Sequence, residues 1–332
     1  MNFLITGGAG FIGSHLSEAL LKLGHAVCII DDLSTGSAKN LENFRTHPQF
    51  TSYFDRVENQ NLMRELIDNA DYIYHLAAAV GVERIIEDPI DCIERNVSGT
   101  EIVLKLAQVK KKPVLITSTS EAYGKSTQKT FSEDDDHILG CAKNLRWSYA
   151  CSKILDEFLA LSYYHKFRSP VSIVRLFNTV GPRQSAQYGM VLPRFVQQAL
   201  SQKPLTVYGD GQQTRCFTHV ADVIAGLLSV MEKKEAIGEI INLGSQNEIS
   251  IYALAQLVKA KTASKSEIKL IPYEKAFASN FEDMQRRVPN LEKAGRILNY
   301  HPRFNLEQIV DDVISFIKTD LEKSQKNVKK SA

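Results

Sequence analysis

The sequence is poor in cysteine, and the few cysteines that it has follow no recognisable pattern. Among 332 residues there are five: Cys28, Cys92, Cys141, Cys151 and Cys216. Their number is odd, they are scattered, and none has C-x-x-C spacing, so neither a disulfide framework nor a cysteine zinc site is indicated. Such a chain fits a reducing compartment, and we expect the cytoplasm.

The sequence also lacks an excess of charge of one sign and a long hydrophobic run. Its formal net charge is +2, whereas a dedicated nucleic-acid binder usually concentrates a basic excess on one face. No run of about 18 apolar residues occurs, so no membrane span is expected. The chain opens directly on a strand-like segment, without the pattern of a secretory signal. The 44% of hydrophobic residues is typical of a soluble globular enzyme.

What the sequence does contain, at its beginning, is one strand–helix–strand unit. Asn2–Thr6 is a short apolar run rich in strand-forming residues, and a glycine-rich segment follows it. Phe11–Leu23 then shows apolar residues at helical spacing, and Gly24 stands where a glycine commonly ends a helix. Ala26–Ile30 is a second apolar run, closed by Asp31. This order predicts a βαβ unit with a glycine turn before the helix.

The alternation of strands and helices continues along the chain and predicts the fold. Nearly continuous apolar runs indicate buried parallel strands at Asp71–Ala79, Pro113–Ser118, Pro170–Phe177 and Glu239–Leu243. Amphipathic patterns indicate helices at Val97–Val109 and Tyr149–Phe167. We therefore predict an α/β fold with a Rossmann-type doubly wound parallel sheet.

After residue 178 the regular alternation of strands and helices stops, which predicts a second, smaller lobe. Turns, the helix Leu192–Leu200 and the short strand Leu205–Tyr208 replace the regular alternation there. We assign 1–177 plus 218–247 to the dinucleotide-binding domain, and 178–217 plus 248–317 to a mixed α/β substrate-binding lobe. Residues 318–332 are rich in lysine, and we expect them to form a basic, disordered tail.

The glycine-rich turn, Gly7-Gly8-Ala9-Gly10-Phe11-Ile12-Gly13, has the features of a dinucleotide-binding loop. Gly7 permits a tight turn, Gly10 lets a pyrophosphate approach the backbone, and Gly13 lets the helix lie close to the strand. The first helical residues, Phe11 and Ile12, would offer free N–H groups and a partial positive charge to phosphates. The spacing is G-x-x-G-x-x-G rather than the common G-x-G-x-x-G.

Asp31, at the end of the next strand, adds the second part of a cofactor site. Its carboxylate would accept hydrogen bonds from the adenosine ribose hydroxyls. A carboxylate there also repels a 2′-phosphate, so the sequence favours NAD over NADP. A glycine turn can serve packing alone, but the strand before it, the helix after it and this acid favour a cofactor loop.

Tyr149 and Lys153 form a candidate catalytic pair. They lie four residues apart on a predicted helix, so their side chains share one face. An ammonium group near a phenol stabilises the phenolate, and we expect Lys153 to lower the pKa of Tyr149 from about 10 towards neutrality. Tyr149 would then act as a general base towards a substrate hydroxyl. The Y-x-x-x-K spacing is common by chance and gains weight only together with the glycine loop.

These motifs resemble the extended short-chain dehydrogenase/reductases, in the branch of nucleotide-sugar epimerases, dehydratases and decarboxylases. Thr6–Gly13 and Tyr149-x-x-x-Lys153 carry the resemblance. Further similar blocks extend it over nearly the whole chain: His75-Leu76-Ala77-Ala78, Asn96-Val97-x-Gly99-Thr100, Arg175-Leu176-Phe177-Asn178, Gly181-Pro182-Arg183 and Asp210-Gly211-x-x-Thr214-Arg215.

The resemblance implies a reaction on a nucleotide-sugar that begins with oxidation at C4 of the sugar. It implies a 4-keto intermediate, NAD reduced and reoxidised within one turnover, and Thr119 as the hydroxyl that hydrogen-bonds the reacting oxygen. The other implied contacts are cofactor contacts from Asp55, Ala77 and Lys153, and substrate contacts from Asn178 and Arg215. At Asp55 the usual Gly-Asp pair is Phe54-Asp55 here. A homodimer is implied through helices near 95–110 and 149–167.

Two features favour decarboxylation after the oxidation. Thr119 is followed by Ser120-Glu121, a pattern that resembles UDP-glucuronate decarboxylases and also GDP-mannose 4,6-dehydratases. Arg146 stands three residues before Tyr149, which is similar to the UDP-glucuronate decarboxylases. Arg287 matches an arginine of those enzymes, although the residues after it differ. Oxidising C4 of a glucuronate makes a β-keto acid that loses carbon dioxide easily, with Glu121 as candidate proton carrier and Arg287 as candidate clamp for the carboxylate or the diphosphate. We predict conversion of UDP-glucuronate to UDP-xylose or its 4-keto pentose.

Three alternatives remain open at the level of sequence. A 4-epimerase of UDP-glucuronate or UDP-glucose needs only that the 4-keto sugar rotates in the pocket, so that the hydride returns to its other face. Large pocket residues decide whether this rotation occurs. A nucleotide-sugar 4,6-dehydratase also begins with the same oxidation. A non-catalytic NAD(H)-binding sensor or scaffold would share the fold, but the tyrosine and the lysine are both present.

Overall fold

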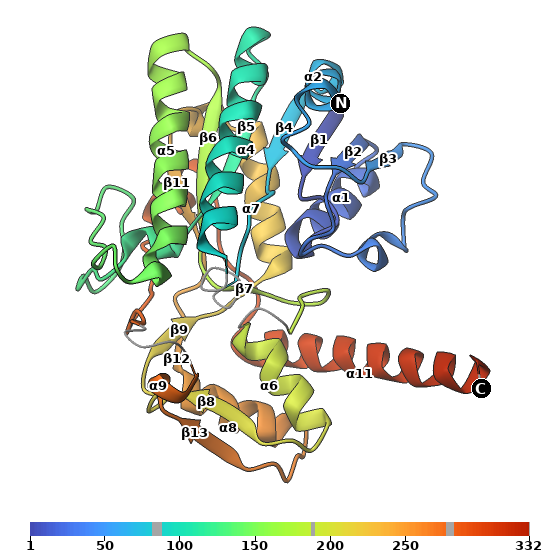
Figure 1. The fold of residues 1–332 in the computed structure, drawn as a ribbon, viewed down its shortest axis with the longest axis vertical. Coiled ribbons are helices and arrows are strands. Elements are labelled where there is room, and N and C mark those ends of the chain that lie inside the picture. Colours follow the sequence, from blue (N-terminus) through green and yellow to red (C-terminus); the bar gives the residue numbers. More distant parts are fainter. Residues whose placement is uncertain (82–87, 187–189, 277–281, 332) are drawn as a thin grey trace.

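The computed structural model describes residues 1–81, 88–186, 190–276 and 282–331 (Figure 1). Its main feature is a seven-stranded parallel sheet in the order β11-β6-β5-β4-β1-β2-β3. The strands are β1 (Asn2–Thr6), β2 (Ala26–Ile30), β3 (Phe50–Tyr53), β4 (Tyr72–His75), β5 (Val114–Thr119), β6 (Val171–Leu176) and β11 (Ile240–Leu243). The strand order reverses between β1 and β4, and ligands of such sheets bind at the carboxyl ends of the strands beside this point.

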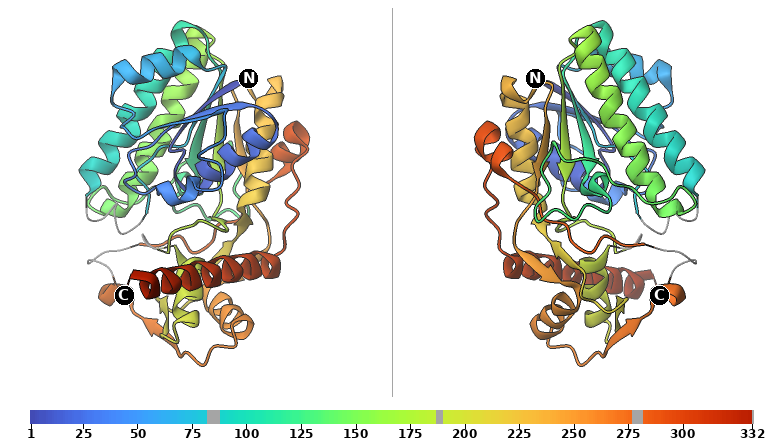
Figure 2. Two further views of the ribbon diagram at one scale, coloured as in Figure 1. Left: turned by 90° about the vertical axis from the view of Figure 1, so that its right-hand side faces the viewer. Right: turned by 90° about the vertical axis from the view of Figure 1, so that its left-hand side faces the viewer.

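Helices cover both faces of the sheet, as the two edge-on views in Figure 2 show. One face carries α1 (Phe11–Lys22), α7 (Val220–Glu232) and α10 (Glu292–Leu298), which share one hydrophobic core with the strands. The other face carries α2 (Gln60–Asn69), α4 (Pro89–Val109) and α5 (Ser148–Phe167), which share a second core. The strands are buried on both sides, which explains their nearly continuous apolar sequences.

A smaller lobe with its own hydrophobic core lies beyond the carboxyl ends of the strands (Figure 1). Its helices are α6 (Val191–Leu200), α8 (Ile251–Lys261), the short α9 (Tyr273–Ala276) and α11 (Leu306–Ser331). Its strand pairs are β8 (Leu205–Tyr208) with β13 (Ile268–Ile271), and β9 (Thr214–Cys216) with β12 (Glu248–Ser250). A two-stranded pair, β7 (Thr179–Val180) with β10 (Thr218–His219), joins the lobe to the sheet.

The predicted α/β fold with a doubly wound parallel sheet is confirmed, and the differences from the expected domain boundaries are local. Segment 291–300 was assigned to the smaller lobe, but Ala294, Leu298 and Tyr300 lie in the core beneath α7. Their apolar side chains cover the sheet there, which their position in sequence did not reveal. The lysine-rich segment from residue 318, expected to lack fixed structure, continues α11. Among the described residues, no helix is both long and apolar enough to cross a membrane.

Candidate active site

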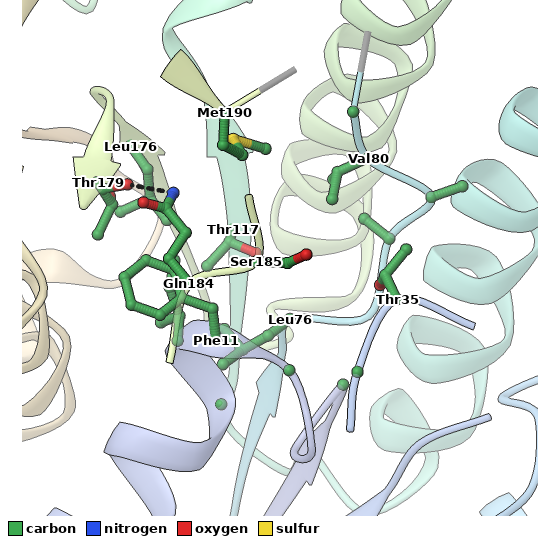
Figure 3. A pocket seen from close by; sticks show the side chains of 18 of the residues that line it. Phe11, Thr35, Leu76, Val80, Thr117, Leu176, Thr179, Gln184, Ser185 and Met190 are labelled. Atoms are coloured by element: carbon green, nitrogen blue, oxygen red, sulfur yellow. Dashed lines mark hydrogen bonds between the residues drawn. The ribbon is translucent and has the colours of Figure 1, made fainter. Parts of the chain in front are cut away.

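A cavity of about 1000 Å³ lies at the carboxyl edge of the sheet, between the sheet and the smaller lobe. Figure 3 shows part of its wall, where Phe11 of α1 and Leu76 and Thr117 of the sheet side lie near Gln184, Ser185 and Met190. The Nε2 amide of Gln184 donates to the Thr179 carbonyl at 2.9 Å, which ties the segment after β7 to that strand. The sequence-predicted residues that line this cavity are Gly7, Gly10, Phe11, Ile12, Gly13, Asp31, Asp55, Ala77, Thr119, Glu121, Tyr149, Asn178, Arg215 and Arg287.

The glycine loop between β1 and α1 leaves no room for side chains. Gly7 has φ +71°, and a Cβ atom there would lie 2.8 Å from the Ala77 nitrogen. A Cβ atom on Gly13 would lie 2.2 Å from the Gly7 carbonyl oxygen. Gly10 caps α1 without any side-chain hydrogen bond, and the first turn contains no acidic residue. The free N–H groups of that turn therefore face the cavity as an anion-binding end, which fits the pyrophosphate of NAD.

The two acids of the predicted cofactor site differ in their surroundings. The nearly buried carboxylate of Asp31 accepts hydrogen bonds from Ala9 N at 2.9 Å and from Leu33 N at 2.8 Å. Burial raises the pKa of Asp31, and these backbone donors partly offset the rise. Asp55 is half-buried, and hydrogen bonds from Asn59 Nδ2 and Arg56 N lower its pKa. Both acids line the cavity, and Asp31 has the more rigid setting.

Tyr149 and Thr119 come together where α5 begins beside the end of β5. The hydroxyl oxygen of Thr119 accepts a hydrogen bond from Glu121 N at 3.2 Å, so Thr119 also caps the short helix that follows the strand. Burial and the charge of Glu121 raise the pKa of Tyr149, and a hydrogen bond with Thr119 opposes the rise. In the protein without a ligand, the pKa of Tyr149 is therefore raised, and the expected lowering is wrong.

Lys153 does not lower the pKa of Tyr149 as expected, because its charge is already paired. Its Nζ atom lies 2.7 Å from Asp156 Oδ2, and both side chains are buried. A carboxylate at this distance compensates most of the ammonium charge that would otherwise stabilise a phenolate. Lys153 is also buried and is absent from the described residues that line the cavity.

Glu121 lies between two guanidinium groups. Its Oε2 atom is 2.5 Å from Arg146 Nη1, and its Oε1 atom is 3.4 Å from Arg287 Nη1. Burial by itself would raise the pKa of Glu121, but the charges of Arg146 and Arg287 lower it to about 2. Glu121 is therefore a carboxylate at neutral pH, and its expected role as a proton carrier stays a prediction.

A second ion pair adjoins this group on the side of the smaller lobe. Arg215 Nη2 binds both carboxylate oxygens of Asp283 at 2.9 Å, and Arg287 Nη2 lies 3.7 Å from the same carboxylate. Burial and the neighbouring Arg215 lower the pKa of Arg287 to about 10. Three guanidinium groups, those of Arg146, Arg215 and Arg287, thus meet two carboxylates, and the excess positive charge suits an anionic ligand.

Asn178 follows β6 in a left-handed backbone conformation, with φ +30°. Its side-chain amide donates to the Cys216 carbonyl at 3.1 Å, which links the end of the sheet to β9 of the smaller lobe. It lines the cavity as predicted, and its amide is held by protein groups on the lobe side.

Sequence reasoning missed three polar residues of this region. Arg146 served as a clue to the reaction but was not proposed as a site residue. Asp283 has no motif of its own, and only its position four residues before Arg287 could have drawn attention to it. Asp156 stands three residues after Lys153, a spacing at which helical side chains meet.

Comparison with known proteins agrees with this geometry. The family model described as GDP-mannose 4,6 dehydratase matches residues 4–313. UDP-N-acetyl-alpha-D-glucosaminuronate decarboxylase of Bacillus cytotoxicus is 43% identical over 316 residues, 95% of this chain and 97% of the relative. UDP-glucuronic acid decarboxylase 1 of Danio rerio is 35% identical over 325 residues, 98% of this chain and 74% of the relative.

A solved structure extends the likeness to the fold. The UDP-glucuronic acid 4-epimerase of Bacillus cereus, in complex with UDP-glucuronic acid and NAD, has a TM-score of 0.87 and 30% identity. It covers 96% of this chain and 99% of its own. With the glycine loop, the Tyr149 site and the family model in agreement, the chain belongs to the GDP-mannose 4,6-dehydratase family, an NAD-dependent branch of the extended short-chain dehydrogenase/reductases.

Proposed function

We propose that the protein removes the C6 carboxylate of a UDP-linked hexuronate. The observation that carries the proposal is the Glu121 carboxylate, fixed between Arg146 and Arg287 on the wall that also contains Tyr149 and Thr119. The decarboxylases among the relatives support it, because they match this chain over nearly its whole length.

The oxidation at C4 is assigned to the cofactor loop and to Tyr149. The N–H groups at the start of α1 would hold the pyrophosphate, and Asp31 would hold the adenosine ribose. When bound, NAD supplies the oxidising power for C4 and recovers it in the same turnover. Tyr149 takes the proton of the C4 hydroxyl, and Thr119 hydrogen-bonds the same oxygen. Burial and neighbouring acids raise the pKa of Tyr149, and the positive ring of bound NAD would favour its phenolate.

The arginines are assigned to the carboxylate and to the charge that develops when it leaves. Once C4 is a ketone, the bond between C5 and C6 breaks, its electron pair moves to C5 and the C4 oxygen as an enolate, and carbon dioxide departs. A proton from a water molecule then adds to C5. Arg287 is nearly buried and its Nε atom has no hydrogen-bond partner among the described residues, so it retains a donor for a substrate oxygen. Glu121 holds Arg146 and Arg287 in place.

For the sugar, we propose the 2-acetamido hexuronate, UDP-N-acetylglucosaminuronate, ahead of UDP-glucuronate. The relative named for the acetamido substrate is 43% identical to this chain, against 35% for the zebrafish relative named for glucuronate. The product would then be the corresponding UDP-2-acetamido-pentose, or UDP-xylose from the unsubstituted sugar.

The test is an incubation of the purified protein with NAD and each UDP-uronate separately. Carbon dioxide and a UDP-pentose, identified by mass spectrometry, are expected with at least one of them. A product that keeps its carboxylate and differs only at C4 would replace the decarboxylase by a 4-epimerase. No conversion of either uronate, and none of UDP-glucose or GDP-mannose, would reject catalysis on these substrates.

We further propose that two copies associate through α4 and α5. These helices lie side by side along one face (Figure 1), and they expose the apolar side chains of Ile90, Ile93, Leu155 and Phe158, the last 62% accessible. Covering such a patch with a second copy removes it from water. Light scattering should give the mass of a dimer, and Phe158→Glu should shift it to the monomer without loss of fold. A monomeric parent protein would contradict this proposal.

A further inference from the structure

Asp156 is a buried acid that the proposed reaction does not use. It lies on α5, three residues after Lys153, with no exposed surface, and its Oδ2 atom is 2.7 Å from Lys153 Nζ. Removing both charges from water is costly, and it is tolerated where each side chain is held by a partner. A hydrophobic residue at 156 would leave Lys153 as an isolated buried cation. The pair therefore fixes the position of an ammonium group one helical turn from Tyr149.

A chain of buried polar groups connects this pair to the strand that carries the cofactor loop. The Ala77 N–H donates to Thr6 Oγ1 at 3.1 Å, and Thr6 Oγ1 lies 2.8 Å from His75 Nδ1. His75 Nε2 lies 3.2 Å from Thr100 Oγ1. The Thr100 hydroxyl in turn hydrogen-bonds the Asp156 carboxylate; burial raises the pKa of Asp156, and Lys153 and this hydrogen bond oppose the rise.

The protonation states along this chain follow from its ends. Burial and the charge of Lys153 lower the pKa of His75 to about 3, so the ring is neutral at physiological pH. Because the Thr100 hydroxyl donates to the Asp156 carboxylate, its oxygen accepts from His75 Nε2, which carries the ring proton. His75 Nδ1 then accepts from the Thr6 hydroxyl. Every donor points towards Asp156, an arrangement that favours its ionised form.

We propose that Asp156 is a positioning residue for the oxidation step. It holds Lys153 one helical turn from Tyr149. Through Thr100 and His75 it also links this ammonium group to the end of β1, where the cofactor loop begins. The proposal rests on the assignment of Tyr149 as the base of the proposed function. In this role Asp156 sets the pH at which Tyr149 becomes active as a base.

The electrostatic direction is defined by the groups that face Tyr149. Besides Asp156 on its own helix, these are Glu121 after β5, Cys92 on α4, the Thr119 hydroxyl and Arg146. The positive charge of Arg146 acts against the acids. The negative charge of Asp156 raises the pKa of Tyr149, as do Glu121 and Cys92. Glu157, the other acid near Asp156, is neutralised by Arg175 at 2.7 Å. Removing the charge at 156 therefore makes the phenol easier to ionise.

The test compares Asp156→Asn, which keeps an oxygen towards Lys153 but removes the charge, with Asp156→Ala, which removes both. In the pH profile of kcat/KM, measured with NAD bound, the acid limb reports ionisation of Tyr149. Asp156→Asn should move this limb to lower pH by about one unit, the smallest effect usual for a single nearby charge. Asp156→Ala should in addition lower kcat about tenfold, because Lys153 loses its position, while the KM for the UDP-sugar stays the same.

The matched control is Asp222→Asn. Asp222 is an equally buried acid in an ion pair with Arg303, on α7 at the opposite face of the sheet from α5, and its substitution should lower thermal stability without moving the pH profile. A second readout that needs no turnover is the ultraviolet difference spectrum of tyrosinate, taken with and without Tyr149→Phe in both the parent and the Asp156→Asn backgrounds with NAD bound. It should show the same shift.

The outcomes separate this inference from the proposed function. If the parent protein converts neither uronate, the proposed function fails, and the tyrosinate spectra still decide the role of Asp156. If the parent is active and Asp156→Asn leaves both the acid limb and the spectra unchanged, Asp156 is a structural residue only and the inference is overturned. If Asp222→Asn moved the acid limb as far as Asp156→Asn does, the inference would be overturned as well.

Discussion

The cavity has two halves that differ in the atoms they present. The half that we propose for the cofactor, the cofactor half, is formed by Gly7–Gly13 and Asp31; it presents backbone N–H groups and a carboxylate held by backbone donors. The half that we propose for the sugar, the sugar half, presents paired side-chain charges from Glu121, Arg146, Arg215, Asp283 and Arg287.

The difference shows two ways of making a polar site in a protein interior. In the cofactor half, what matters is the absence of side chains, since a single methyl group would collide with the backbone. In the sugar half, each charge depends on partners from other segments, and Glu121 and Arg287 are 166 positions apart. The first half is defined locally along the chain, and the second exists only after folding.

The largest expected effect separates chemistry from cofactor binding. Tyr149→Phe removes the proposed base and should lower turnover about a thousandfold. The affinity for NAD, measured by calorimetric titration, should not change, because the cofactor half is intact. Unaltered turnover would remove Tyr149 from the catalytic assignment.

The next effect tests the sugar half with neighbouring arginines. Arg287→Gln should lower decarboxylation about a hundredfold, the usual cost of losing one donor to a developing charge. Arg286→Gln is the control, because Arg286 is more exposed and pairs with Glu248 rather than with Glu121. Carbon dioxide release measures both. Equal losses in the two variants would mean that charge in general, and not the place of Arg287, supports the reaction.

The third effect concerns stability and acid pH. The folded protein lowers the pKa of Glu121 from 4.5 to about 2. A lowered acid pKa contributes stability that is complete above the unfolded value and is lost as pH falls through the folded one. Glu121→Gln should therefore unfold more easily at neutral pH by about 3 kcal/mol. The gap should close between pH 4.5 and 2. Urea titrations measure it, and a gap independent of pH would show that Glu121 acts by shape alone.

The smallest effect tests the cofactor half. Gly13→Ala places a Cβ atom 2.2 Å from the Gly7 carbonyl oxygen, so α1 must shift away from the loop. We expect the affinity for NAD to fall about tenfold, equivalent to about 1.4 kcal/mol. Gly295→Ala is the matched control, since that helical glycine has no neighbouring atom within 4 Å of the added Cβ among the described residues. Equal affinities in the two variants would contradict the close approach.

Much of the fold and of the residue set could be predicted from the sequence, because both depend on short-range patterns. The strands around the glycine loop were predicted because buried parallel strands read as continuous apolar runs. Helix α2 and the edge strand β3 were not predicted. Strand β3, Phe50–Tyr53, is short and only partly buried, so it has no continuous apolar run. Segment 291–300 was assigned to the wrong core, because apolar residues alone do not tell which surface they cover.

The electrostatic predictions were less successful, for a related reason. The pair of Tyr149 and Lys153 was found by its spacing, but the effect of Lys153 depends on Asp156 and on burial. Glu121 was found by its motif, but its ionised state depends on Arg146 and Arg287. A pKa is the sum of contributions from everything within several ångströms, and a motif contains only the neighbours along the chain.

The sequence by itself determined the doubly wound sheet and the dinucleotide-binding loop, because a helical or strand period and a turn that requires glycine depend on consecutive residues. The family of reactions followed from the resemblance of several sequence blocks to nucleotide-sugar enzymes. Only the tertiary structure decided that Glu121 is a clamped carboxylate, that Lys153 is neutralised by Asp156, and that the three arginines share one wall. Those properties arise from charges brought together in a poorly solvated interior, where distance and burial set their strength.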